Sequence, residues 1–193
     1  MSKIIGVDID GVLTKEGKGK DNIWLKELNK HFNYSVERVR DSYDFREAFN
    51  LKESELKSFL QSKLAKVYSQ VEHYPRARKV LKKLKENGIT IYLITARSPE
   101  FRTLTEKWLS EKNISYDYLY HEDEKAILAR KKNIDIFIED KAENILELLK
   151  VDISVIVMDR YHNQKLPEKN IYRAYNWEDI EKFLKNEFGF NFL

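Results

Sequence analysis

The stretch Asp8-Ile9-Asp10-Gly11-Val12-Leu13-Thr14 begins within the first apolar run of the chain, residues 4–9. Continuous apolar character favours a strand that is covered on both faces, as in a parallel sheet. The two carboxylates lie two positions apart at the strand exit, and Gly11 permits a sharp turn directly after them. The stretch therefore predicts a buried strand that brings two carboxylates close to one ligand at the edge of a sheet.

Other parts of the chain repeat this strand-then-helix order. Apolar runs are found at residues 89–94, 134–138 and 153–158, with a weaker candidate at 116–120. Helical patterns follow at residues 75–87, 101–112, 122–132 and 141–150. Strands that alternate with helices predict an α/β sandwich with right-handed crossovers.

One segment interrupts the alternation. Residues 15–73 contain no strand run but show helical patterns at 24–32 and 54–68, after a linker with Gly17 and Gly19. We interpret this segment as a helical insert between the first strand and its crossover helix. The core domain is then expected to comprise residues 1–14 and 74–193.

Polar residues follow the predicted strands at the points where ligands bind in open α/β sheets. They are Asp8 and Asp10, Thr95, Ala96 and Arg97, Glu139 and Asp140, with Lys125 early in the helix after the weak strand. Carboxylates bind hard cations, and Mg²⁺ is the usual cation beside phosphate. A lysine and a hydroxyl can balance and bind phosphate oxygens. This combination predicts metal-assisted phosphoryl chemistry, in which one aspartate attacks phosphorus and the other transfers protons.

These motifs resemble those of the haloacid dehalogenase (HAD) superfamily. The stretch from Asp8 to Thr14 is similar to the first motif, Ile94-Thr95-Ala96-Arg97 to the second, Lys125 to the third and Ile138-Glu139-Asp140 to the acidic fourth. The resemblance covers residues 3 to about 150, with the insert in the position of the superfamily's helical cap. It implies a Rossmann-like three-layer sandwich with a mainly parallel sheet and a small helical cap after the first strand.

The resemblance also implies a role for each residue. Asp8 would be the nucleophile and a metal ligand, and Asp10 the acid/base, with its backbone carbonyl on the metal. Asp140 would be the acidic ligand of a Mg²⁺ cofactor, and Glu139 would orient a metal-bound water.

The same resemblance places the remaining residues around the phosphate. Lys125 would stabilise the nucleophile and the phosphate, and Thr95 would bind phosphoryl oxygens, with Ala96 and Arg97 completing the substrate-binding set.

The presence of Asp10 favours a phosphate-monoester hydrolase, because dehalogenase-type members have no second aspartate there. The compact insert, the Tyr74-Pro75 helix start and the Glu139-Asp140 pair resemble the 5′(3′)-deoxyribonucleotidase-like branch. The expected substrate is a small phosphorylated metabolite, with a nucleoside monophosphate as first candidate. Thr95-Ala96-Arg97-Ser98 departs from the second motif of the characterised nucleotidases in that branch.

Structural roles are open for several of these residues. Asp140 and Ser98 are also candidate helix caps, and Lys125 a surface lysine. Arg97 is a candidate for either a phosphate contact or a structural ion pair. The four histidines lack metal-ligand spacing and are interpreted as structural or exposed: His31, His73, His121 and His162.

Composition bears on the rival functions. The 35 basic and 32 acidic residues are mixed along the chain, which argues against a nucleic-acid end-processing phosphatase with a basic strip. A non-catalytic domain that binds a partner or a phospholigand would be favoured by the loss of Asp8, Asp10 or Asp140, and none is lost. The absence of cysteine excludes a thiolate nucleophile and a cysteine zinc site. No apolar run predicts a signal peptide or a membrane span, so a cytoplasmic location is the default.

Overall fold

The computed structural model describes residues 3–166 and 171–190 of the chain. The chain divides into two compact units: unit 1 is residues 1–14 with 73–193, and unit 2 is residues 15–72. The expected boundary of the insert differs from this division by one residue, His73. The chain passes between the units at β2 (Thr14–Lys15) and β3 (Glu72–His73), which pair as a two-stranded sheet.

Unit 1 contains a six-stranded sheet with the order β5-β4-β1-β6-β7-β8. Its strands are β1 (Ile4–Val7), β4 (Thr90–Thr95), β5 (Tyr118–His121), β6 (Ile136–Glu139), β7 (Ser154–Met158) and β8 (Ile171–Ala174). All five pairings between neighbours are parallel. The predicted α/β three-layer fold is therefore confirmed. The strand order reverses at β1, so the carboxyl end of β1 is the switch point where ligands bind in such sheets.

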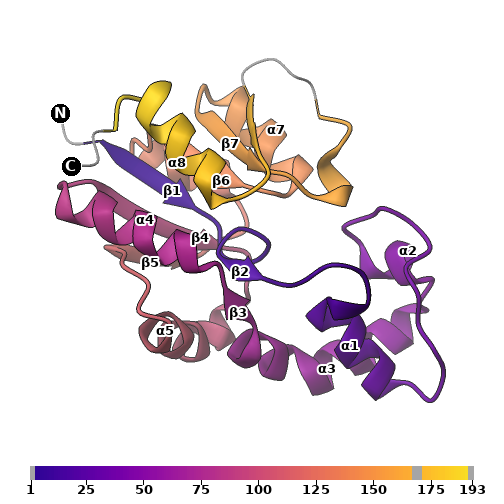
Figure 1. Cartoon of the computed structure of the whole chain (residues 1–193). Coiled ribbons are helices and arrows are strands. Elements are labelled where there is room, and N and C mark those ends of the chain that lie inside the picture. The colour runs from indigo at the N-terminus through magenta and orange to yellow at the C-terminus, as the bar shows by residue number, and fades with distance from the viewer. Residues whose placement is uncertain (1–2, 167–170, 191–193) are drawn as a thin grey trace. The chain divides into compact units, whose positions relative to one another are not determined.

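Helices cover both faces of this sheet (Figure 1). They are α4 (Pro75–Glu86), α5 (Arg102–Glu111), α6 (Lys125–Lys131), α7 (Ala142–Lys150) and α8 (Trp177–Asn186), with short 3₁₀ turns η2 (Pro99–Phe101) and η3 (Tyr161–Asn163). On one face, the apolar sides of α6 and α7 pack on alternate strand residues such as Phe137 and Val155. On the other face, α4 packs against α8 and β4. The sheet is thus buried on both sides, which explains the continuous apolar runs.

The sequence did not predict every strand. β8 is short and contains Arg173, so it lacks a continuous apolar run. β2 and β3 have two residues each, which is too few for a periodic pattern.

Unit 2 is helical apart from its ends at β2 and β3. Its elements are η1 (Gly19–Asp21), α1 (Ile23–His31), α2 (Phe45–Phe49) and α3 (Glu53–Gln70). Asn22 and Asp44 cap α1 and α2 by accepting backbone N–H groups, as short polar side chains do at helix starts. A separate small core lies within the unit: Leu28, Val36, Ala48, Phe49, Leu51 and Phe59.

Candidate active site

The loop after β1 is a tight turn fixed by its own backbone. Asp8 donates its N–H to Ile138 O at 3.0 Å, and Leu13 and Thr14 donate theirs to Ile9 O at 2.9 and 3.0 Å. Gly11 has φ 78° and donates its N–H to Thr14 Oγ1 at 2.9 Å. A Cβ at this position would collide with the Asp140 carboxylate. Glycine is required here by its positive φ and by the close approach of that acid.

Lys125 lies between two acids at the carboxyl end of the sheet. Its Nζ donates to Asp8 Oδ1 at 2.6 Å and to Glu139 Oε2 at 2.8 Å. The Lys125 side chain is 2% exposed, so it is not a surface lysine. The first turn of α6 therefore brings a cation directly to the predicted nucleophile.

Glu139 has all its hydrogen bonds inside the protein. Oε1 accepts the backbone N–H groups of Asp140 and Lys141, each at 3.0 Å. Oε2 accepts Asn144 Nδ2 at 3.2 Å as well as Lys125. With four donors, Glu139 fixes the start of α7 and the position of Lys125. The predicted role of Glu139 in orienting a metal-bound water stays a prediction.

Asp140 does not cap α7, whose N-cap residue Lys141 makes no side-chain cap. Its Oδ2 lies 3.2 Å from His162 Nε2. One oxygen each of Asp8, Glu139 and Asp140 lies within 4.8 Å of the other two. Carboxylate oxygens grouped at this spacing, with phosphate to complete the shell, suit a hard cation such as Mg²⁺. Asp8 and Asp140 would hold the cation, because both oxygens of Glu139 already accept hydrogen bonds from the protein.

The electrostatics of this cluster follow from burial and mutual repulsion. Burial raises the pKa of Asp8 well above its ordinary value; Lys125 opposes this shift, and Glu139, Asp140 and Asp10 add to it. Burial also raises the pKa of Asp140, with the His162 hydrogen bond opposing it. Burial acts against the charge of Glu139, but Lys125 and the two N–H donors bring its pKa below the ordinary value. Crowded, desolvated carboxylates of this kind are typical of functional sites.

Asp10 is paired with Arg97. Nε and Nη2 of Arg97 donate to the two carboxylate oxygens of Asp10, each at 2.7 Å. The Arg97 side chain is fully buried, while that of Asp10 is 25% exposed. Of the two roles left open for Arg97, the structure shows an ion pair.

Thr95 and Ala96 lie at the end of β4. Leu93 of β4 is level with Val7, so Thr95 reaches two residues farther, beside the start of the β1 loop. Thr95 is buried and its Oγ1 accepts Arg97 N at 3.2 Å, whereas Ala96 is exposed. His121 Nδ1 donates to the carbonyls of Arg97 at 2.8 Å and Ser98 at 3.2 Å, which fixes this loop.

The loop after β7 contains site residues that were not predicted from the sequence. Arg160 donates to Gly11 O and, at 3.3 Å, to Tyr74 Oη, so it contacts the β1 loop. His162 and Asn163 both contact Asp140. These polar residues follow the apolar run 153–158 just as the other site residues follow their strands, and this position is the sequence signal for the loop.

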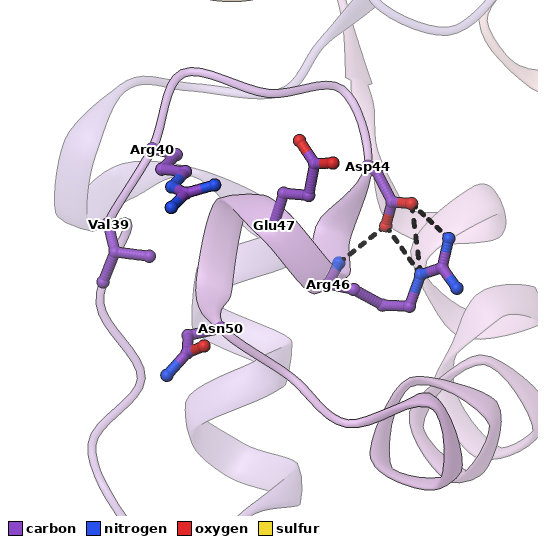
Figure 2. Close-up of a pocket in the computed structure, with 6 residues that line it drawn as sticks. All are labelled: Val39, Arg40, Asp44, Arg46, Glu47 and Asn50. Atoms are coloured by element: carbon purple, nitrogen blue, oxygen red, sulfur yellow. Dashed lines mark hydrogen bonds and ion pairs between the residues drawn. The ribbon is translucent and has the colours of Figure 1, made fainter.

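A separate hollow lies on unit 2 (Figure 2). Its volume is about 570 Å³ and its lining residues are Val39, Arg40, Asp44, Arg46, Glu47 and Asn50. Within it, Arg46 turns toward Asp44, with Nη2 2.5 Å from Oδ2. The hollow contains none of the predicted site residues, so the acid cluster of unit 1 remains the candidate active site.

Among the described residues, no helix is both long and apolar enough to cross a membrane.

The fold and the acid cluster with its lysine define a HAD-type phosphoric monoester hydrolase. The chain belongs to the family described as 5′ nucleotidase, deoxy (pyrimidine), cytosolic type C protein, whose model matches residues 2–187. It is 32% identical over 179 residues to a nucleotidase of Clostridium acetobutylicum, covering 91% of this chain and 90% of that one.

Solved structures share the fold at low sequence identity. A haloacid dehalogenase-like hydrolase from Streptococcus pneumoniae has a TM-score of 0.66 at 14% identity, over 95% of this chain and 98% of that one. A HAD family hydrolase from Deinococcus radiodurans with bound phosphate and sodium has a TM-score of 0.66 at 12% identity, over 95% of each chain. The expected superfamily and its nucleotidase-like branch are confirmed by the family match.

Proposed function

We propose that this protein is a Mg²⁺-dependent phosphatase of nucleoside monophosphates that acts through an aspartyl-phosphate on Asp8. One observation carries the proposal: Lys125 Nζ lies 2.6 Å from Asp8 Oδ1 in a buried site that also contains Asp140. The family match and the nucleotidase relative support the substrate class. The cytoplasmic location remains a prediction.

The chemistry has two steps. A carboxylate oxygen of Asp8 forms a bond to phosphorus while the bond from phosphorus to the leaving oxygen breaks, and Asp10 gives that oxygen its proton. Water then attacks the phosphorus, Asp10 takes a proton from it, and the bond between Asp8 and phosphorus breaks. Mg²⁺ bound by Asp8 and Asp140 would neutralise charge on the phosphoryl oxygens. Lys125 adds a fixed cation beside the nucleophile, and Thr95 offers a hydroxyl to the phosphate.

The rival functions have less support. A non-catalytic binding domain would be favoured by the loss of one of the predicted catalytic carboxylates, whereas Asp8, Asp10 and Asp140 are all present and Lys125 contacts Asp8. A nucleic-acid phosphatase would need a basic surface strip, and the charges of the chain are balanced and mixed.

The deciding experiment is a hydrolysis screen over a panel of phosphate monoesters, with and without Mg²⁺. Nucleoside monophosphates should be the best substrates. Asp8→Asn is the control, and it should lower kcat by about three orders of magnitude or more, roughly 4 kcal/mol of barrier. Its fold should be little changed, since the swap is isosteric and Lys125 keeps Glu139 as its charge partner. An Asp8→Asn enzyme that keeps a tenth of the turnover, with deamidation excluded, rules out covalent catalysis by Asp8.

A further inference from the structure

We infer that Arg97 is a positioning residue that holds the Asp10 carboxyl in its orientation for proton transfer, rather than a ligand of the phosphate. The inference rests on the proposed acid/base role of Asp10. Its basis is the bidentate ion pair, in which both oxygens of Asp10 accept hydrogen bonds from the guanidinium of Arg97.

The guanidinium of Arg97 is itself fixed. Nη1 donates to Thr105 Oγ1 at 3.3 Å, and Thr105 is fully buried on α5. The Cζ atom lies 5.9 Å from the ring centroid of Trp108, another buried α5 residue. His121 Nδ1 also donates to the backbone carbonyl of Arg97. Separating the pair would leave a buried cation without its charge partner, which is strongly unfavourable.

This arrangement constrains Asp10. The planar fork of an arginine matches a carboxylate and fixes its plane as well as its distance. One lone pair on each oxygen accepts from Arg97, and the other stays available for a proton on the exposed side. An acid that must meet the leaving oxygen gains from such fixing, because small misplacements reduce rates steeply.

The test separates positioning from phosphate binding through the leaving group. An alkoxide leaving group, as in a nucleoside 5′-monophosphate, needs a proton in the transition state, whereas p-nitrophenolate leaves without one. Arg97→Lys keeps the charge but loses the fork. It should lower kcat/KM, which reports the phosphoryl transfer to Asp8 and not the later hydrolysis, about a hundredfold on the nucleotide and at most about tenfold on p-nitrophenyl phosphate, with inhibition by inorganic phosphate nearly unchanged. Thr105→Val removes the hydroxyl that accepts from Arg97 Nη1, and it should give a smaller loss with the same dependence on leaving group.

Two comparisons make the result decisive. Arg102→Lys changes an exposed arginine of the same helix α5 and should leave both activities unchanged. In the Asp10→Asn background, Arg97→Lys should cause little additional loss, because both changes act on one group.

Other outcomes overturn the inference. If Arg97→Lys raises KM for both substrates and weakens inhibition by inorganic phosphate to the same extent, Arg97 is a phosphate ligand. If Arg97→Lys does not fold, an equal loss on both substrates in Thr105→Val has the same force. If kcat/KM of Asp10→Asn shows no leaving-group dependence, Asp10 is not the acid of the proposed function, and this result separates failure of that function from failure of the Arg97 inference.

Discussion

Asn163, on the loop after β7, donates its side-chain N–H to the backbone oxygen of the predicted metal ligand Asp140 at 2.7 Å. The same Nδ2 donates to Met158 O at 2.9 Å. Its Oδ1 accepts Arg160 N at 3.2 Å and Arg173 Nη1 at 2.8 Å. Asn163 is 1% exposed, so a single buried amide ties the ends of β6 and β7 to β8.

Asn163→Asp should therefore be destabilising and should also impair the site. The new side chain is isosteric but cannot donate to the two carbonyls, and each unsatisfied buried group costs about 1–3 kcal/mol. We expect a loss of about 2 kcal/mol or more in the free energy of unfolding, measured in urea, with weaker activation by Mg²⁺. Gln164→Ala is the matched control in the same loop: its hydrogen bonds to Asp159 and Arg160 are exposed to water, so their loss should change stability by less than about 0.5 kcal/mol. Equal stability of the two variants would show that the loop does not support Asp140.

Asp140→Ala should weaken the response to Mg²⁺. It removes a carboxylate from the cluster with Asp8 and Glu139, and a hard cation loses an oxygen ligand. The Mg²⁺ concentration for half-maximal activity should rise about tenfold or more, with partial recovery at high Mg²⁺ because Asp8 and the phosphate oxygens remain.

The control for this variant is Asp152→Asn. Asp152 is exposed and precedes β7, so it lies at the opposite end of that strand from the site. Its Mg²⁺ response should equal that of the wild type. An unchanged Mg²⁺ response in Asp140→Ala would remove this residue from the metal site.

A pH-dependent stability term is expected from Glu181 on α8. Its carboxylate is 6% exposed and pairs with Arg76 and Lys83 of α4. Burial acts against its charge, but the Arg76 hydrogen bond and these cations lower the pKa below the ordinary 4.5. A lowered folded-state pKa contributes stability that is complete above the unfolded pKa and is lost as the pH falls through the folded value.

Glu181→Gln should therefore lower stability at neutral pH by about 1 kcal/mol, since the cations are partly exposed and screened. The difference from the wild type should shrink as the pH falls below about 4.5. Thermal unfolding at several pH values measures it, and Glu86→Gln, which breaks an exposed pair on α4, should show no such trend. A difference that stays constant with pH would mean that Glu181 acts through packing rather than charge.

The fold and the position of the site carboxylates at one edge of the sheet could be predicted from the sequence, because both depend on short local patterns. Asp8 and Asp10 follow a buried strand within one seven-residue motif, and parallel strands converge at one edge. Lys125 was found only through its order relative to the other motifs, since the chain is rich in lysine. Asp10, the ion-pair partner of Arg97, lies 87 positions away in the sequence. No local pattern could therefore show whether Arg97 binds Asp10 or a phosphate.

Asn163 and β8 could not be predicted from the sequence for a similar reason. Asn163 acts through four hydrogen bonds to backbone and arginine groups, and such contacts leave no periodic signal. β8 is recognised by its pairing with β7, which brings Val155 opposite Ile171, rather than by its own composition.

We propose that unit 2 is the element that selects the substrate. It is inserted four residues after Asp10 and has its own small core, so it can be removed without cutting the sheet of unit 1. The pairing of β2 with β3 brings the two chain crossings together, so a short linker can close the gap. Replacing residues 17–70 by a short glycine-serine linker should leave unit 1 able to unfold cooperatively. If unit 2 selects the substrate, the KM for a nucleoside monophosphate should then rise about tenfold or more relative to that for p-nitrophenyl phosphate. Adding Asp8→Asn to the deletion protein should abolish the remaining activity and exclude a contaminant. If a folded deletion protein loses both activities equally, selectivity resides in the loops after Thr95 and Asp140 instead.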